Sequence, residues 1–331
     1  MQTADESGQH AELAARYVHP TMIENLQDLV RAAACDYAYT PPLDAFRGAL
    51  SLRDRIYRQL DLTGHPQQQT DLFLAASQTC SLLAVATFDL GYANPAQQHA
   101  RSALTYGQLA GDTTAQAFAH AVRCTLAFWS GQPTRGIEHA QAGLQLRSSG
   151  TAAVRLHAVA ARCSALRGDR TAAVEHMRAA EDARGGSDPM CDEIGGEFGF
   201  SPARTALSAG ASYLALDDGI EAARHASKAL ELFATADAQE RWISGESGAR
   251  TDLVTAHVLG KQLDQAAHHA ELLIALPSAH RTERLIVRVQ RLQTELTRRG
   301  LARDPRAMQI SAALEEFVVD SLPRALPSGI I

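Results

Sequence analysis

The sequence predicts an all-α fold, an α-solenoid of about 14 helices arranged in antiparallel hairpins. The first observation is a turn residue that recurs at positions 91, 131, 168, 217 and 260, each followed by small residues at matching offsets. A unit of about 40 residues is typical of helical repeat arrays. The second observation is that apolar residues recur at helical spacing, whereas no segment alternates with period two as a strand would.

The N-terminal part precedes the repeats. Residues 1–12 are polar, and we expect them to be disordered. Residues 13–66 are predicted to form a helical cap of two helices. Pro41 and Pro42 separate these helices, because proline disfavours a helix in the residue that precedes it.

The repeats occupy residues 70–281 as five units of two helices each. A glycine-rich insert at 185–201 interrupts the period between the third and the fourth unit. Residues 282–331 follow as two capping helices and a tail, PRALPSGII, for which we expect no regular structure. The apolar residues between Leu301 and Leu326 favour a homodimer.

Composition narrows the classes of function. The net charge of −6 provides no overall attraction for nucleic acid or an anionic membrane. Five cysteines without a CxxC pair indicate buried thiols of a cytoplasmic protein rather than disulfides or zinc ligands. We expect no signal peptide and no membrane-spanning helix. No catalytic, nucleotide-binding or metal-binding motif stands out, so we expect no enzyme activity, no cofactor and no metal.

Two levels of resemblance follow from these residues. The small residues at Gly91/Ala96/Ala103 and Gly168/Ala173/Ala180 resemble the tetratricopeptide repeat. The phrases TFDLGYANPAQQHARSALTYGQLAGD (87–112), DEIGGEFGFSPART (192–205) and ASKALELFATADAQER (226–241) resemble the repeat region of actinobacterial helix-turn-helix transcriptional regulators of the XRE class. The resemblance covers roughly residues 70–300. It implies repeats that sense a ligand, bind a protein partner or dimerise.

The resemblance stops before the DNA-binding domain of that family. About 40 residues precede the first proline break, and they contain no compact helix-turn-helix. We therefore expect the chain to lack the N-terminal DNA-binding domain, either lost or removed, and expect no direct nucleic-acid binding.

A histidine recurs on the second helix of each unit: His99, His139, His176, His225 and His269. A metal ladder or a pH sensor is one interpretation. Because successive units lie roughly 10 Å apart, two such histidines cannot share one zinc ion. We expect these residues to pack between repeats on the convex side, with one ring nitrogen hydrogen-bonded.

The first helix of each unit is expected to line a concave groove. Counting back from each turn residue selects the candidate ligand-binding side chains Gln78, Phe118, Thr125, Arg155, Arg162, Arg204 and Arg250. Arginine holds a carboxylate or phosphate in a bidentate fork. A groove that is apolar at one end and cationic at the other suits a small acidic ligand or an acidic peptide. The alternative is that these arginines pair with carboxylates such as Glu197 or Asp252.

The insert adds Phe198 and Phe200 to the candidate site, because its apolar residues need a surface to cover and the groove is the nearest. A lid over the groove and simple packing between units three and four are both open interpretations. Cys191, Asp192, Glu193 and Glu197 could be metal ligands, but no matching pair of histidines accompanies them.

The sequence therefore predicts a sensing module of a signalling or transcription-regulatory protein, which binds an acidic ligand or peptide and a protein partner. The first alternative is a protein–protein scaffold with no small ligand, which an open, flat groove would favour. The second is an enzyme built on repeats, which would need an unpaired histidine or acid in a closed cavity.

Overall fold

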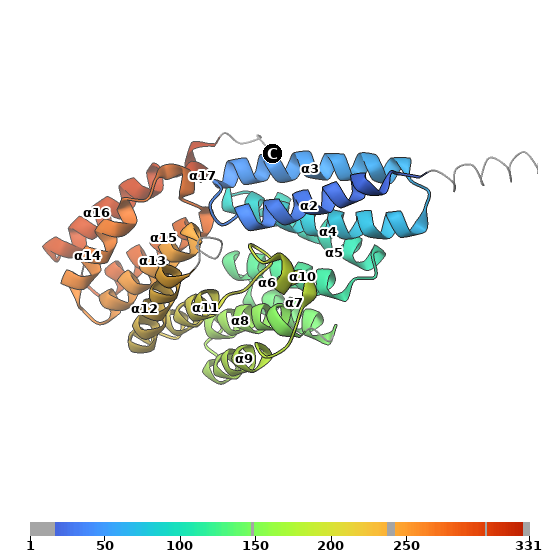
Figure 1. Cartoon of the computed structure of the whole chain (residues 1–331). Helices are drawn as coiled ribbons and strands as arrows, with labels where there is room; N and C mark the ends of the chain where they lie inside the picture. The colour runs from blue at the N-terminus through green and yellow to red at the C-terminus, as the bar shows by residue number, and fades with distance from the viewer. Residues whose placement is uncertain (1–16, 147–148, 237–241, 302, 327–331) are drawn as a thin grey trace, which may run out of the picture.

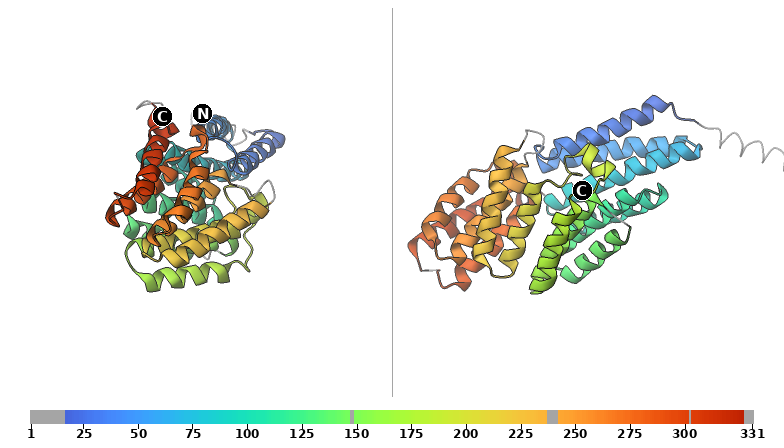
Figure 2. Two further views of the ribbon diagram at one scale, coloured as in Figure 1. Left: turned by 90° about the vertical axis from the view of Figure 1, so that its left-hand side faces the viewer. Right: turned by 60° about the horizontal axis from the view of Figure 1, so that its bottom comes forward.

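A computed structural model shows the fold of residues 17–146, 149–236, 242–301 and 303–326 (Figure 1). Within these ranges every regular element is helical, which confirms the all-α repeat architecture. The hairpins follow one another along a curved array, and the C-terminal helices come back beside the N-terminal ones (Figures 1 and 2). The disorder predicted for residues 1–12 lies outside the described residues.

Three helices that each begin with a proline in the first turn open the described part of the chain: α2 (Pro20–Asp36), α3 (Pro42–Leu62) and α4 (Pro66–Asp89). Proline is tolerated there because the first turn leaves its N–H groups unbonded in any case. By length and composition α4 could cross a membrane, contrary to expectation. However, 83% of its apolar window is buried inside the fold, as in the core helix of a globular protein.

The five repeat units are helical hairpins in which α4 is the first helix of unit one. The remaining helices are α5 (Ala93–Leu109), α6 (Thr113–Trp129) and α7 (Pro133–Gln145), α8 (Gly150–Leu166) and α9 (Arg170–Ala183), α11 (Pro202–Ala215) and α12 (Gly219–Thr235), and α13 (Ile243–Leu259) and α14 (Leu263–Ile274). The small residues after each turn are buried, and they allow close approach of neighbouring helices. A Cβ at Gly143, for example, would come within 2.7 Å of the side chain of Leu156.

The turns of the five units share a left-handed residue. Its φ is 90° at Gly91, 69° at Gly131, 78° at Gly168, 59° at Asp217 and 56° at Lys261. The fifth turn was therefore placed one residue too early in the sequence, at a glycine with a φ of −80°. Because one residue turns an α-helix by about 100°, this shift also moves the predicted groove face of α13.

Four of the five repeated histidines lie beside an aromatic ring of their own hairpin, a contact that the sequence analysis did not predict. His139 lies beside His120 of the same hairpin, with ring centroids 6.2 Å apart. His176 lies beside His157, and their Nδ1 atoms are 3.1 Å apart. The pairing follows from the hairpin itself, which brings the first helix of a unit against the second.

The end of the chain closes the array onto its beginning. A short 3₁₀ turn (Ser278–His280) leads to α15 (Glu283–Arg298), α16 (Pro305–Val319) and α17 (Leu322–Ala325). The last of these is a one-turn helix in the segment predicted to lack regular structure. It lies against the turn after α4, where Pro323 approaches Gly91. Helix α15 also contacts α4 directly.

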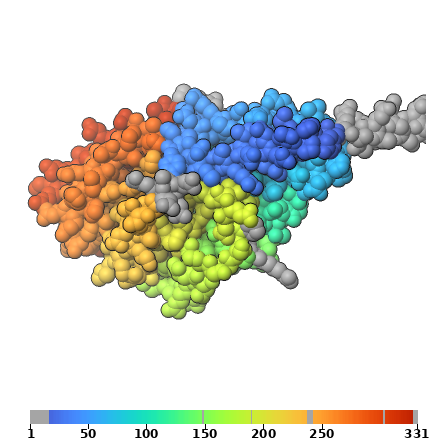
Figure 3. Space-filling view, viewed as in Figure 1, coloured from blue at the N-terminus to red at the C-terminus, as the bar shows by residue number. Residues whose placement is uncertain are grey.

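The apolar core is divided. One large cluster extends across α2 to α8, and separate clusters hold α11 to α13 and α13 to α16. The insert forms a short helix, α10 (Pro189–Ile194), followed by a turn and loop at residues 195–200, which we call the strap. On the surface the insert lies against the N-terminal helices (Figure 3).

Candidate functional site

A cleft lies on the concave side, where the first helices of the units face one another. Side chains from α4, α6, α8, α11 and α15 line it, together with Glu197 and Phe200 of the strap. Its free volume is only about 50 Å³. A neighbouring cavity of about 300 Å³ shares Trp129 and Arg288 with it and extends toward α15. The concave side therefore contains two connected spaces, of which the one beside the strap is nearly filled by side chains.

Buried arginines dominate the cleft. All are 8% exposed or less: Arg155, Arg162, Arg204, Arg284 and Arg288. Three buried carboxylates face them: Asp89, Glu197 and Asp252. The arginines come from α8, α11 and α15, whereas the carboxylates come from α4, the strap and α13. Positive charge therefore exceeds negative charge in a water-poor environment, where each unpaired ion is costly.

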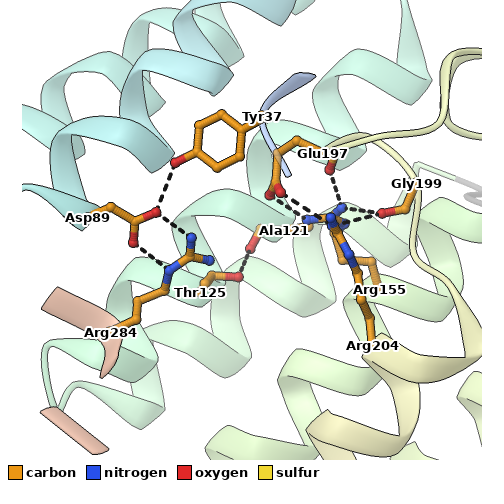
Figure 4. A network of polar contacts seen from close by, with 9 residues as sticks. All are labelled: Tyr37, Asp89, Ala121, Thr125, Arg155, Glu197, Gly199, Arg204 and Arg284. Carbon is orange, nitrogen blue, oxygen red and sulfur yellow. Dashed lines mark hydrogen bonds and ion pairs between the residues drawn. The ribbon is translucent and has the colours of Figure 1, made fainter. Parts of the chain in front are cut away.

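Glu197 binds two arginines at once (Figure 4). Its carboxylate lies 3.5 Å from Nη1 of Arg155 and 3.3 Å from Nη1 of Arg204. The two guanidinium groups also donate to the carbonyl oxygen of Gly199, at 2.7 and 3.1 Å. Burial lowers the pKa of Arg204 to about 10, and Glu197 opposes that shift. The strap is thus held to α8 and α11 by charge-assisted hydrogen bonds.

Asp89 and Arg284 form a second buried pair, which joins residues 195 positions apart. Nε and Nη2 of Arg284 donate to the two carboxylate oxygens at 2.6 and 2.5 Å. The hydroxyl group of Tyr37 donates to the same carboxylate at 2.9 Å (Figure 4). Burial alone would lower the pKa of Arg284, but Asp89, together with Tyr37 and Glu197, reverses this effect and raises the pKa. This cluster fastens α2, α4 and α15 together.

Arg162 has no such partner. Within the described part of the chain its guanidinium makes no hydrogen bond and no ion pair, although Nε is fully buried. Burial, together with the charge of Arg288, lowers its pKa to about 9. The ring of Phe128 lies 5.8 Å from the guanidinium carbon. A buried cation without an anion is unfavourable in the free protein.

Three further buried donors without acceptors among the described residues belong to side chains that line the cleft. They are the indole N–H of Trp129, Nε of Arg155, and Nη2 of Arg288, whose Nε donates to Asp252 at 3.0 Å. The guanidinium of Arg288 stacks 4.6 Å from the Trp129 ring. Buried donors in native proteins nearly always have acceptors.

The structure brings most of the predicted site residues together. Thr125, Arg155, Arg162, Arg204 and Phe200 line the cleft. Phe118 and Phe198 lie beneath it, edge to face with centroids 4.9 Å apart, and Phe118 supports Arg155. Gln78 is buried in α4 and does not line the cleft.

Arg250 was predicted wrongly. It pairs with Glu246 at 3.1 Å on its own helix and lines neither the cleft nor the cavity beside it. The physical reason is the fifth turn. Counting back from Lys261 instead places Thr251 and Thr255 on the inner face, and Thr255 does line the adjacent cavity.

Sequence reasoning missed the contribution of α15, which it treated as a capping helix. Arg284, Arg288 and Arg291 recur at spacings of four and three on this helix, beside a buried apolar stripe that includes Leu285 and Val289. A stripe of arginines along a helix that also packs inward was the available signal. Both tryptophans of the chain, Trp129 and Trp242, also line the cleft.

The proposed metal ligands of the insert serve other purposes. Asp192 accepts from the backbone N–H of Asp188, which caps α10, and Cys191 is buried beside it. Glu197 holds the two arginines. In the described ranges no group of three or more His, Cys, Asp or Glu side chains is arranged to hold a metal ion.

Comparisons with known proteins agree with the fold. No family model and no curated protein matches the sequence. Among solved structures, the chain is similar to the Rap protein whose crystal structure was determined in complex with competence and sporulation factor. The TM-score is 0.57 at 13% identity, over 90% of this chain and 86% of that chain. At this identity the similarity shows a tetratricopeptide-type helical array and no more.

Proposed function

We propose that the chain is a ligand-sensing repeat module of a signalling or transcription-regulatory protein, and that its cleft binds an acidic peptide or a small acid. The observation that carries this proposal is that one cleft is lined by side chains with buried donors that have no acceptor among the described residues: Trp129, Arg155, Arg162 and Arg288. A carboxylate accepts several hydrogen bonds and neutralises the excess positive charge.

Two further observations support a regulatory role. The Rap protein of similar fold was crystallised with a signalling factor. The repeats of this chain also resemble those of XRE-class regulators, which implies a protein partner that reads the bound state. We also propose a cytoplasmic location, from the cysteine pattern, and a homodimer, from the apolar residues between Leu301 and Leu326.

The alternatives fit the cleft less well. A scaffold with no small ligand would present an open, flat groove, whereas this cleft is narrow and lined by buried side chains. An enzyme would need a free acid or base in the cavity. The acids that line the cleft or the cavity beside it include Glu197 and Asp252, and both are paired with buried arginines.

Native mass spectrometry of freshly isolated protein tests the proposal. Wild-type protein should retain an acidic compound that Arg162→Met loses, because methionine keeps the volume and removes the charge. Arg250→Met is the matched control, since Arg250 lies outside the cleft. The same retained compound in wild type and Arg162→Met would contradict the proposal.

Tryptophan fluorescence provides a second test that needs no endogenous ligand. Both tryptophans line the cleft, so an acid that binds there should change the emission directly. A capped tetrapeptide with glutamate at both ends and two glycines between them is a suitable probe. Equal responses of wild type and Arg162→Met to this probe would contradict the proposal.

A further inference from the structure

Glu197 occupies a position in the cleft that suits the carboxylate of a ligand. Its side chain is 3% exposed and lies between Arg155 of α8 and Arg204 of α11. These arginines occupy the same register, 13 residues before the turn of their unit, so the pair is built by the repeat. The carboxylate between them does not come from a repeat. It is delivered by the strap, which is an insertion into the period.

The cleft thus contains two anion positions. Arg155 and Arg162 are seven residues apart on α8, which corresponds to roughly 10 Å along the helix axis. The position at Arg155 and Arg204 is filled by Glu197. At the other position Asp252 pairs with Nε of Arg288, whereas Arg162 has no ion pair within the described chain. A ligand that used both positions would carry two carboxylates separated by a similar distance.

The strap prevents such a ligand from entering. The free volume beneath it is about 50 Å³, whereas sites for drug-sized ligands need roughly 300 Å³ or more. Glu197 and Phe200 of the strap line that space. A ligand of this size therefore requires the strap to move away from the cleft.

On the N-terminal side the strap is held by the side chain of Phe198, which is fully buried in the large apolar cluster, and by two hydrogen bonds. The backbone N–H of Glu197 donates to the carbonyl oxygen of Ala34 at 2.8 Å, and Sγ of Cys35 donates to the carbonyl oxygen of Ile194 at 3.2 Å. The strap begins with Gly195 and Gly196, both left-handed with φ of 68° and 54°. Exchanging Glu197 for a ligand carboxylate leaves Arg155 and Arg204 paired throughout, so their buried charges never lose an anion.

We propose that Glu197 is a tethered substitute for the second carboxylate of a diacid ligand. The ligand places one carboxylate at Arg162 and Arg288 and the other between Arg155 and Arg204, and its binding releases the strap. This inference rests on the proposed function of the cleft and adds the ligand's second acidic group and the movement that accompanies binding.

The reactivity of Cys191 measures the movement. Cys191 lies in α10, just before the strap, is 1% exposed, and burial raises the pKa of its thiol. Alkylation by iodoacetamide, followed by peptide mapping, reports its rate separately from those of the helix-buried Cys124 and Cys163. Glu197→Gln should speed the alkylation of Cys191 about fivefold or more through local opening, with the other two rates unchanged.

Two classes of probe distinguish the sources of the ligand. Millimolar suberate, a linear diacid, and the tetrapeptide with two glutamates should each be compared with octanoate, which has one carboxylate. In wild-type protein a diacid should accelerate the alkylation of Cys191, whereas octanoate should not. In Glu197→Gln the strap is already released, so the same diacid should bind more tightly without further acceleration. A response to the tetrapeptide alone assigns a peptide ligand, and a response to suberate assigns a small acid.

Gly196→Ala provides a variant that leaves every charge in place. A Cβ at Gly196 would overlap the carbonyl group of Ala34, and φ of 54° disfavours alanine. This variant should also accelerate the alkylation of Cys191, and it keeps the test available if Glu197→Gln does not fold. Wild-type rates in the variants that fold would overturn the inference, as would equal effects of octanoate and both diacids. Neither result affects the proposed function, which depends on the loss of binding in Arg162→Met.

Discussion

The concave and convex sides of the array both present an ionisable side chain at the same position of successive units, but they use it differently. On the convex side, His139, His176 and His269 each meet another histidine of their own hairpin, at ring distances of 6.2, 5.4 and 5.6 Å. On the concave side, Arg155 and Arg204 occupy equivalent positions and share one carboxylate that no repeat supplies.

The difference separates what the repeat needs for folding from what the protein adds to it. The convex histidines find their partners within one hairpin, so the pattern can recur unchanged. The concave arginines find theirs on the strap, on α4 and on α13, and Arg162 has none among the described residues. A partner that recurs within each hairpin therefore indicates packing. Arginines whose partners come from outside the repeat pattern indicate the site.

The largest effect is expected from Asp89→Ala on the concave side. It leaves Arg284 buried without its partner, and we expect the free energy of unfolding to fall by about 3–5 kcal/mol. Urea denaturation measures the change. The double variant Asp89→Leu, Arg284→Met removes both charges and should recover most of the loss. A small effect of Asp89→Ala would show that this pair does not hold the ends of the array together.

A smaller effect is expected from pH on the convex side. Burial, with the nearby charges of Arg123 and Arg224 respectively, lowers the pKa of His139 and of His225 to about 4. In the unfolded chain each histidine titrates near 6.5. The unfolded state therefore takes up protons between pH 6.5 and 4 that the folded state does not, and stability falls as the pH falls through this range.

The size of the pH effect follows from the same shifts. Each of the two rings should contribute about 1 kcal/mol of lost stability at pH 5, after allowing for partial exposure. Urea denaturation at pH 7.5 and pH 5 measures it, with His139→Gln as the comparison. A loss of the same size in His139→Gln would show that other groups cause the pH dependence.

A change of opposite sign is expected from Arg162→Met. Removing a buried cation without a partner should raise the free energy of unfolding by about 1 kcal/mol, in contrast to the loss expected for the paired arginines. Such a residue reduces stability in the free protein and is typical of a binding site. Thermal and urea denaturation of the ligand-free protein would measure the change. A clear loss of stability would mean that Arg162 has a structural partner, and the contrast between the two surfaces would disappear.

The smallest effect is expected at a turn. Lys261 adopts a left-handed conformation that glycine adopts without strain, so Lys261→Gly should stabilise the protein by about 0.5 kcal/mol. Gly131→Ala is the converse change, at φ of 69° with open space around it, and should destabilise by about 1 kcal/mol. Two opposite shifts in the urea midpoint would confirm that the fifth turn is at residue 261.

The fold was predictable from the sequence because the residues that determine each hairpin lie within that hairpin. A left-handed turn and small residues at constant offsets, such as Ala96 and Ala103 after Gly91, determine the hairpin locally. The strap was identified only as an interruption, and its contacts with α2 had no periodic signal.

Only part of the site was predicted, because some of its residues lie outside the repeats. Arg155, Arg162 and Arg204 were found by counting back from turns, and Arg250 failed because its turn was misplaced by one residue. The pairing of Asp89 with Arg284 could not be found from local pattern, since 195 residues separate them. Which arginine lacks a partner depends on all of these contacts together.

The separation of Asp89 from Arg284 has a consequence for synthesis. A ribosome adds roughly 5–20 residues per second, so Asp89 emerges roughly 10–40 s before its partner exists. During that interval the first units can complete their own hairpins, but the carboxylate of Asp89 has no guanidinium to meet. The contact between α4 and α15 that closes the curved array can therefore form only after α15 has left the ribosome. Hydrogen exchange of stalled nascent chains that end before residue 284 should show α4 still open near Asp89.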